Sequence, residues 1–346
     1  MIKAGIIGAT GYAGNEIVRL LLSHGNASVE WLVSKSYEGQ DYSGIYRNFF
    51  DVLDMKCLGT DLDALLDRVD VVFTATPQGY LSSILKSSML EKARFIDLSA
   101  DYRIKDVATY EEWYKIEHKS TELIKEAVYG LSEINRDKIR DTRLLANPGC
   151  FTTCSILTAY PLVKEHLIDP DTLIINALSG VSGAGRGAKT ANLFCEVNEN
   201  AKAYGVTNHR HTPEIEEQLG YAYGREIKVN FTPHLIPMNR GILATETADL
   251  VEGADEEKVR SAYEKYYGSE TFIRLMRDGE NPETRFVEGS NYVDIGYRID
   301  KRTGRIVMMG ALDNLIKGAA GQAVQNMNIM FGYDETEGLK AIPMIP

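Results

Sequence analysis

Short apolar runs alternate with helix-like segments over the first 150 residues of the chain. Ala4–Ile7 is followed by a 3.6-residue repeat of apolar positions near Glu16–Leu22, and Val29–Val33 is the next apolar run. Strand, helix and strand within about 30 residues are typical of a βαβ unit. Val69–Phe73 and Ala93–Leu98 read as further buried strands. The pattern therefore predicts an α/β domain with a doubly wound parallel sheet.

The pattern changes after about residue 150 to longer strand-like runs at 173–177, 227–231, 241–247 and 293–298. These predict a second, α+β domain with a mixed or antiparallel sheet. Residues 314–331 are rich in Ala, Gln and Met, which favours a long helix that returns to the first domain. We therefore expect a first domain over residues 1–148, joined by the C-terminal helix within 312–346, and a second domain over residues 149–311.

Composition excludes several classes of protein. The 346 residues carry a net charge of −11, with 25% charged and 44% hydrophobic residues, which are ordinary values for a soluble domain. The acidic balance and the lack of a basic block argue against a nucleic-acid or anionic-membrane footprint. Four cysteines are too few for a disulfide scaffold. Without a signal peptide or a long apolar run, we expect a cytoplasmic protein with no membrane contact.

A glycine-rich segment follows the first predicted strand. Gly8, Gly11 and Gly14 are spaced as GxxGxxG, a variant of the dinucleotide-binding motif, and Thr10, Tyr12 and Ala13 fill the gaps. Glycines there let the backbone approach a pyrophosphate, whose charge the helix N-terminus receives. A purely structural glycine turn is the alternative.

The second predicted strand ends in Ser34, Lys35 and Ser36 instead of the acidic residue that takes a ribose hydroxyl in NAD sites. Two hydroxyls and a cation suit a 2′-phosphate, so the segment predicts NADP(H) over NAD(H). A solvated polar loop is the alternative.

Cys150 is a candidate nucleophile. It follows Asn147 and Pro148, which read as the N-cap and first residue of a helix, and it would lie in that helix's first turn. A helix N-terminus lowers a thiol pKa and offers N–H groups to an oxyanion. A purely structural, buried role is the alternative for Cys150. We interpret Cys57, Cys154 and Cys195 as structural.

His211 is a candidate general base. It precedes Thr212 and Pro213, which read as the start of another helix, where the dipole favours a neutral imidazole. Zinc binding with His209 or a structural role are the alternatives. A thiolate, a neutral histidine and a nicotinamide cofactor together favour reversible conversion of an acyl phosphate to an aldehyde through a thioester.

Three loops could bind anions. Residues 179–187 combine glycine, hydroxyls and one cation, so Ser182 and Gly183 could contact a cofactor or substrate. Arg103 and Arg240 each follow a predicted strand, where they could hold the phosphate or a carboxylate of the substrate. The Asn314 amide could bind the nicotinamide carboxamide. Surface or structural roles are the alternatives.

Taken together, these segments resemble the N-acetyl-γ-glutamyl-phosphate reductases of arginine biosynthesis, relatives of aspartate-semialdehyde dehydrogenase. The matching blocks lie at 8–14, 97–103, 129–133, 147–153, 179–186, 209–215, 233–238 and 313–325. The resemblance implies NADPH-dependent reduction of N-acetyl-γ-glutamyl phosphate, a Rossmann domain, a catalytic and oligomerisation domain, and Cys150 as the nucleophile. A dimer or tetramer is expected.

The resemblance also bears on single residues. It implies that one histidine of the 209–211 block transfers the proton; we assign that role to His211 and substrate contact to His209. Within the matching blocks we expect Asn147 and Glu214 to contact the substrate as well. The loop with Pro77 is expected beside the cofactor, although it has Gln78 where the family would have His.

Two other functions stay open at this point. The substrate could be a related acyl phosphate, such as aspartyl phosphate or a carrier-linked aminoadipyl phosphate, because pocket shape sets chain length. A catalytically silent NADP-binding module would need the cysteine and histidine to be incidental.

Overall fold

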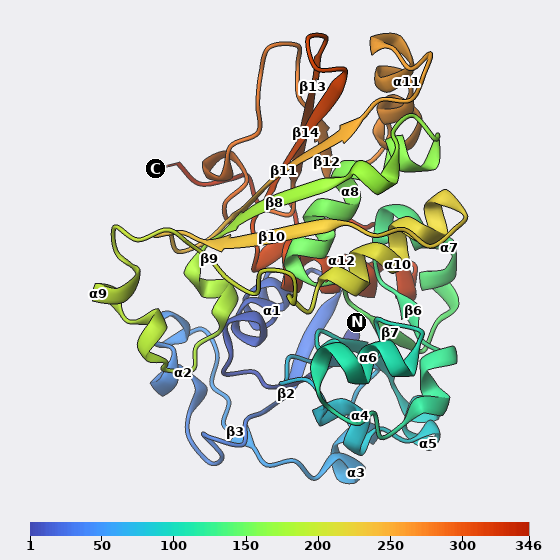
Figure 1. Cartoon of the computed structure of the whole chain (residues 1–346). Helices are drawn as coiled ribbons and strands as arrows, with labels where there is room; N and C mark the ends of the chain where they lie inside the picture. The colour runs from blue at the N-terminus through green and yellow to red at the C-terminus, as the bar shows by residue number, and fades with distance from the viewer. Residues whose placement is uncertain (346) are drawn as a thin grey trace. The chain divides into compact units, whose positions relative to one another are not determined.

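The computed structural model describes residues 1–345, which form two compact units. The first unit comprises residues 1–148 and 319–340, and the second comprises residues 149–318 and the segment from Ala341 onward. Figure 1 shows a sheet with flanking helices in each unit. The predicted fold class, a Rossmann-type domain followed by an α+β domain, is confirmed.

Within the described residues, seven parallel strands form the sheet of the first unit, in the order β3-β2-β1-β4-β5-β7-β6. The order reverses direction at β1, the switch point at which open α/β sheets bind ligands. The strands are β1 (Ile2–Ile7), β2 (Ala27–Val33), β3 (Cys57–Leu58), β4 (Val71–Thr74), β5 (Arg94–Asp97), β6 (Val128–Tyr129) and β7 (Leu144–Ala146).

The helices of the first unit are mostly short. They are α1 (Tyr12–Leu22), α2 (Tyr42–Ile45), α3 (Leu62–Leu65), α4 (Tyr80–Ile84), α5 (Ser87–Lys92), α6 (Val107–Tyr114), α7 (Ser132–Asp141) and α12 (Gly321–Phe331), with 3-10 turns at Arg47–Phe49, Leu66–Arg68 and Thr121–Lys125.

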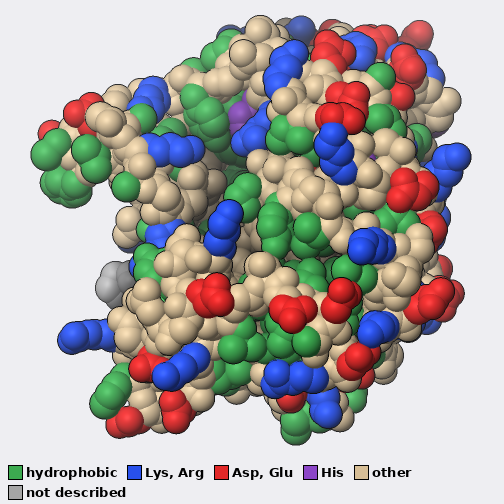
Figure 2. All heavy atoms as spheres, turned by 90° about the horizontal axis from the view of Figure 1, so that it is seen from below, with side chains coloured by type: hydrophobic (Ala, Val, Ile, Leu, Met, Phe, Trp, Pro, Cys, Tyr) green, Lys and Arg blue, Asp and Glu red, His purple; other side chains and the backbone are tan. Residues whose placement is uncertain are grey.

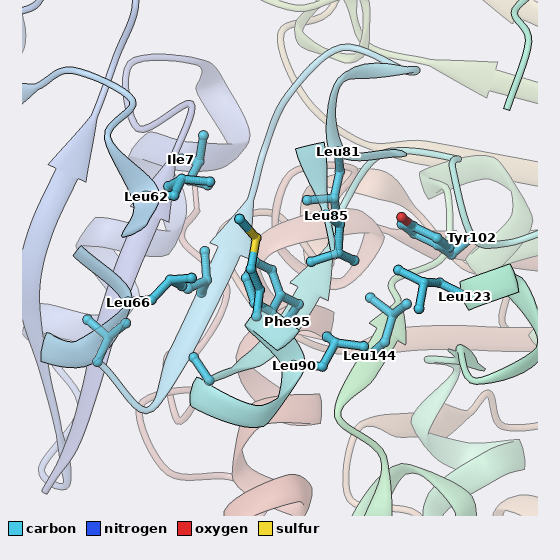
Figure 3. Packing of buried hydrophobic residues seen from close by; sticks show 14 of the residues in the cluster. Ile7, Leu62, Leu66, Leu81, Leu85, Leu90, Phe95, Tyr102, Leu123 and Leu144 are labelled. Atoms are coloured by element: carbon cyan, nitrogen blue, oxygen red, sulfur yellow. The ribbon is translucent and has the colours of Figure 1, made fainter. Parts of the chain in front are cut away.

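An apolar core fills one side of this sheet. Figure 3 shows Leu66, Leu81 and Phe95 among the side chains that converge there from helices and strands. Trp31 on β2 is fully buried, and its Nε1 donates to Leu65 O at 3.1 Å. A Cβ on Gly5 would lie 2.1 Å from the Trp31 ring, so β1 has no side chain where the indole lies against it.

Helix α12 packs within the first unit, as predicted for a C-terminal helix that returns to this domain. Its polar side chains are buried and bonded within this unit: Asn326 Nδ2 donates to Gly130 O at 2.7 Å, and Asn328 Oδ1 pairs with His24 Nε2 at 2.7 Å. Buried amides with partners of this kind fix one docking position for the helix. The predicted start at Asn314 was wrong, because a π-helical turn, Ile316–Ala320, precedes α12.

Among the described residues, the second unit also contains a seven-stranded sheet, which is mixed and has the order β12-β13-β14-β11-β8-β10-β9. Its elements are β8 (Ile174–Ser179), β9 (Lys202–Ala203), β10 (Asn230–Leu235), β11 (Ile242–Asp249), β12 (Ile273–Leu275), β13 (Val293–Asp300), β14 (Arg305–Leu312), α8 (Cys150–Lys164), α9 (Phe194–Val197), α10 (Thr212–Tyr223) and α11 (Glu256–Tyr267), with 3-10 turns at Pro170–Thr172, Val181–Ala184, Thr190–Asn192 and Thr284–Phe286.

Helix α8 is buried on nearly every side, between this sheet and helices α10 and α11. Pro161 lies inside it and lacks the N–H that would bond to Leu157 O. The Tyr267 hydroxyl donates to that carbonyl at 2.7 Å, and the Tyr263 hydroxyl donates to Thr158 O at 2.8 Å. Two tyrosines of α11 thus bond to α8 carbonyls in the turn before Pro161.

Glu246 lies beneath α8 on the covered face of β11. The alternation of β11 places it on the same face as Ile242, Ala244 and Ala248, and it is fully buried. Neither carboxyl oxygen has a hydrogen-bond partner among the described residues. Burial raises the pKa of Glu246 well above its ordinary value, and the nearby Ser155 hydroxyl only partly opposes the shift. The carboxyl therefore keeps its proton to a higher pH than an exposed glutamate does.

On the face drawn in Figure 2, acidic and basic side chains are interspersed over the surface. No helix in the described part of the chain is long and apolar enough to cross a membrane.

Candidate functional site

The glycine-rich loop turns from β1 into α1 in the first unit. Gly8 has φ +79°, and a Cβ there would lie 2.2 Å from Ala75 O. A Cβ on Gly14 would lie 2.3 Å from Gly8 O, whereas one on Gly11, the N-cap of α1, would make only an ordinary contact. Two of the three glycines are thus required by close backbone approach, and the N-terminus of α1 has the form of an anion cradle.

Two tyrosine hydroxyls bond to the backbone of this loop, and the sequence did not predict them. The Tyr42 hydroxyl donates to Ala9 O and the Tyr46 hydroxyl to Thr10 O, each at 3.0 Å. Both tyrosines follow β2, beyond the motif itself, so no local pattern points to them.

The end of β2 meets the same loop. The backbone N–H groups of Gly8 and Ala9 donate to Val33 O, and the Thr10 and Ser34 hydroxyls lie 2.7 Å apart. Ser34 is buried, while Lys35 and Ser36 are exposed. The predicted cation and one predicted hydroxyl therefore face solvent at the edge of the glycine loop.

The loop with Pro77 follows β4 and is held by a buried carboxylate. Asp101 accepts from Gly79 N at 2.7 Å and from Ser82 N at 2.9 Å, and so caps the start of α4. Asp97 lies beside it: burial and the Asp101 charge raise the pKa of Asp97 to about 6, against hydrogen bonds from Ser99 and Thr74. Pro77 itself is exposed.

Arg103 and Asn147 have partners within the first unit. Arg103 is 6% exposed, and its guanidinium donates to Asn147 O at 2.8 Å and to Leu98 O at 2.7 Å. The Asn147 side chain is fully buried, donates to Ala319 O and accepts from Asn326 Nδ2, each at 3.1 Å. Both residues thus help to order the end of β7, directly before Cys150.

Cys150 begins α8 and is partly exposed, whereas Cys154, one turn further, is fully buried. The predicted cap at Asn147 was wrong, because Gly149 is the N-cap and Cys150 the first helical residue. A helix N-terminus directs backbone N–H groups and positive potential at the thiol. Burial raises the pKa of Cys154, which keeps that thiol inert.

Glu214 ties α10 to the start of α8. Its Oε1 accepts from Gly149 N at 3.0 Å and from the Thr152 hydroxyl at 2.7 Å, and the residue is 1% exposed. The carboxylate therefore fixes the residues on both sides of the Cys150 thiol.

The two histidines lie together at the start of α10. His211, rather than the predicted Thr212, is the N-cap residue. The rings of His209 and His211 are 4.9 Å apart, and both contact Phe151, the neighbour of Cys150. His209 Nδ1 accepts from His211 N at 3.1 Å. Burial, followed by the nearby His211 and Arg210, lowers the pKa of His209 to about 3, so this ring is neutral.

The predicted loop residues Ser182, Gly183 and Asn314 also meet in the second unit. Asn314 Nδ2 donates to the Ser182 hydroxyl at 3.0 Å, and Asn314 Oδ1 accepts from Gly241 N at 2.8 Å. Arg240, which precedes Gly241, pairs with Asp313 at 3.4 Å. Among the described residues, no group of three or more His, Cys, Asp or Glu could hold a metal ion.

Comparisons with known proteins agree along the whole chain. Two family models match, described as "Semialdehyde dehydrogenase, NAD binding domain" over residues 3–142 and "Semialdehyde dehydrogenase, dimerisation domain" over residues 150–314. Curated relatives named N-acetyl-gamma-glutamyl-phosphate reductase include those of Lachnospira eligens, 63% identical with 100% of both chains covered, and of Campylobacter jejuni, 53% identical with 98% of both covered.

Solved structures of similar fold include aspartate semialdehyde dehydrogenase II from Vibrio cholerae, with a TM-score of 0.71, 19% identity, and 96% of this chain and 98% of that chain covered. The aspartate semialdehyde dehydrogenase with NADP from Candida albicans has a TM-score of 0.71 and 17% identity, with 96% of this chain and 99% of that chain covered. At this identity the likeness concerns the fold alone.

Proposed function

The chain belongs to the N-acetyl-γ-glutamyl-phosphate reductases, within the semialdehyde dehydrogenases, and from that we propose that it reduces N-acetyl-γ-glutamyl phosphate to N-acetylglutamate 5-semialdehyde and phosphate with NADPH, as a step of arginine biosynthesis. The observation that carries the proposal is Cys150 at a helix N-terminus whose next residue, Phe151, contacts two histidines, in a chain that also has a glycine-rich loop before a helix.

The first unit fits NADP(H). Gly8 and Gly14 let the loop pack closely against neighbouring backbone, and Thr10, Gly11, Tyr12 and Ala13 supply the start of α1 for the pyrophosphate. We assign the 2′-phosphate to Lys35 and Ser36, which are exposed, with Ser34 bonded to Thr10 behind them. Pro77 of this unit, and Ser182, Gly183 and Asn314 of the second unit, are proposed for the nicotinamide half. When bound, NADPH supplies the hydride that reduces the acyl group.

Cys150 carries the acyl group. Its thiolate attacks the acyl carbon of the acyl phosphate, the bond from that carbon to the phosphate oxygen breaks, and inorganic phosphate leaves a thioester on Sγ. The N-terminus of α8 stabilises both the thiolate and the oxyanion. Glu214 contributes indirectly, because it fixes Gly149 and Thr152 around the thiol.

His211 moves the proton. It first takes the proton of the Cys150 thiol, and after reduction of the thioester it gives that proton to the thiohemiacetal oxyanion. The same imidazole then accepts the hydroxyl proton as the carbon–sulfur bond breaks, which releases the aldehyde and restores the thiolate. His209 is held neutral in its aromatic surroundings and accepts from His211 N, so we assign it to orienting His211 and contacting the substrate.

The two predicted arginines are proposed to bind the anionic groups of the substrate. We assign the phosphate to Arg103, whose bonds to Leu98 O and Asn147 O hold it at the end of the first unit's sheet. The α-carboxylate is assigned to Arg240. Asn147 acts by ordering the backbone before Cys150.

We also propose a homodimer or tetramer assembled through the second unit. The matched dimerisation model supports this, and so do apolar side chains on the face of the sheet opposite α8, such as Leu178, Leu243 and Met309, which are only partly buried. The four cysteines are free, which suits a reducing compartment such as the cytoplasm.

The reverse reaction tests the function. NADPH formation is followed from N-acetylglutamate 5-semialdehyde with and without inorganic phosphate, with aspartate semialdehyde as the control substrate. Phosphate-dependent turnover of the acetylated aldehyde is expected. A preference for aspartate semialdehyde, or turnover without phosphate, would contradict the proposal.

A further inference from the structure

Asp313 lies at the end of β14 and is fully buried. Its Oδ1 accepts from Leu315 N at 2.8 Å and from Ile316 N at 3.1 Å, at the start of the π-helical turn. Its Oδ2 accepts from Gly289 N at 2.8 Å and lies 3.4 Å from an Arg240 guanidinium nitrogen. Three backbone donors therefore fix this carboxylate before it meets the arginine.

The backbone around Arg240 is also held in place, by contacts with the loop that begins at Gly180. A Cβ on Gly180 would lie 2.7 Å from Arg240 N, so the two loops are in direct contact. Ser182 N donates to Asn239 O at 3.1 Å, and Gly180 N donates to Gly241 O at 2.9 Å. The Arg240 side chain is nevertheless 25% exposed, which leaves the guanidinium accessible to a solute.

The segment from Asp313 to Gly318 also contacts Cys150. Asp313 O accepts from Gly318 N at 2.9 Å, and a Cβ on Gly318 would lie 2.8 Å from Cys150 Cβ. The carboxylate that holds Arg240 and the glycine that lies against Cys150 thus belong to one hydrogen-bonded turn of the second unit.

We propose that Asp313 is a positioning residue that fixes the Arg240 guanidinium for the α-carboxylate of the substrate, and thereby makes the enzyme select acyl phosphates that carry this group. The inference rests on the proposed function and deepens it. A guanidinium recognises a carboxylate through a planar fork, which works only when its orientation is fixed.

Two roles for Asp313, orienting the Arg240 guanidinium or only reducing the local positive charge, predict opposite effects of its loss on substrate binding. If Arg240 attracted the substrate by net charge alone, loss of the Asp313 negative charge would strengthen substrate binding. If Asp313 orients the fork, the same loss weakens binding of the carboxylate-bearing substrate and leaves one without a carboxylate unaffected.

The experiment compares two aldehydes in the reverse reaction of the full-length enzyme, with NADP and inorganic phosphate. N-Acetylglutamate 5-semialdehyde carries the carboxylate, and 4-acetamidobutanal is the same chain without it. Asp313→Asn is expected to lower kcat/KM for the first aldehyde by roughly 10- to 100-fold, mainly through KM, and to change the second by less than about 3-fold. Arg240→Met should abolish the preference, and adding Asp313→Asn to it should have no further effect.

Asp294→Asn is the matched control, because Asp294 is also a buried aspartate paired with an arginine, Arg274, at 2.6 Å. It should keep the preference. Equal losses for both aldehydes in Asp313→Asn, or an intact preference, would overturn the inference while the proposed function stands. If Asp313→Asn does not fold, Arg240→Lys keeps the charge without the fork and should show the same loss of preference. Wild-type enzyme that turns over neither aldehyde would overturn the proposed function and this inference with it.

Discussion

The buried carboxyl of Glu246 makes the stability of the second unit depend on pH. Its ordinary pKa is 4.5, and burial raises the pKa in the folded state. Between these two values the folded chain keeps a proton that the unfolded chain has lost. Stability therefore falls as pH rises through this window, by about 1.4 kcal/mol for each pH unit.

Glu246→Gln keeps the size of the side chain and removes the titrating proton. The variant is expected to match the wild type at low pH and to become relatively more stable above about pH 5, with a gap that grows by about 1.4 kcal/mol per pH unit until the folded pKa is reached. The difference between the free energies of unfolding of the two proteins cancels the contributions of all other titrating groups. Glu252→Gln, at an exposed position, is the control and should give a constant difference.

The assay is urea unfolding from about pH 5 to about pH 8. Both tryptophans, Trp31 and Trp113, lie in the first unit, so tryptophan fluorescence does not report on Glu246. Far-UV circular dichroism, together with hydrogen exchange of the β11 amides, follows the second unit. Parallel stability curves for wild type and Glu246→Gln would refute the reasoning, because they would mean that Glu246 titrates alike in both states.

Three further predictions concern the proposed function. Cys150→Ser should reduce turnover by at least about 1,000-fold while the Kd for NADPH, measured by fluorescence, stays the same; retained activity would exclude the thioester route. Lys35→Ala should weaken NADPH binding by roughly 10-fold and leave NADH binding unchanged, and an unaltered ratio of the two Kd values would remove Lys35 from the 2′-phosphate site. Met309→Glu should lower the mass measured by light scattering to that of a smaller assembly, since a charge would then lie on the open face of the sheet; an unchanged mass would place the interface elsewhere.

The first unit was largely predictable, because buried parallel strands leave long apolar runs and the glycine loop has a fixed spacing. β14, Arg305–Leu312, was missed although it is mostly apolar and a turn that ends at Gly304, with φ +74°, separates it from β13. The single helix predicted from Asn314 failed because Asp313 accepts from the next backbone N–H groups and starts a π-helical turn instead.

Residue types in the candidate site were easier to predict than their partners. Arg103 was predicted to bind an anion from its place after a strand, but its bond to Asn147 O depends on a contact distant in sequence. Glu246 carried a signal that went unused, since its strand alternates and places a carboxyl among Ile242 and Ala244. Sequence spacing gives the face of a strand, whereas the partner on another element comes only from the fold.

The way α12 completes the first unit has a consequence for biosynthesis. The ribosome delivers the seven strands of the described first unit early, but Asn326 and Asn328 emerge only after residues 149–318 of the second unit have been made. Until then, Gly130 O, His24 and the end of β7 lack their final partners. A nascent chain, or one truncated before α12, would expose these groups to proteases and chaperones.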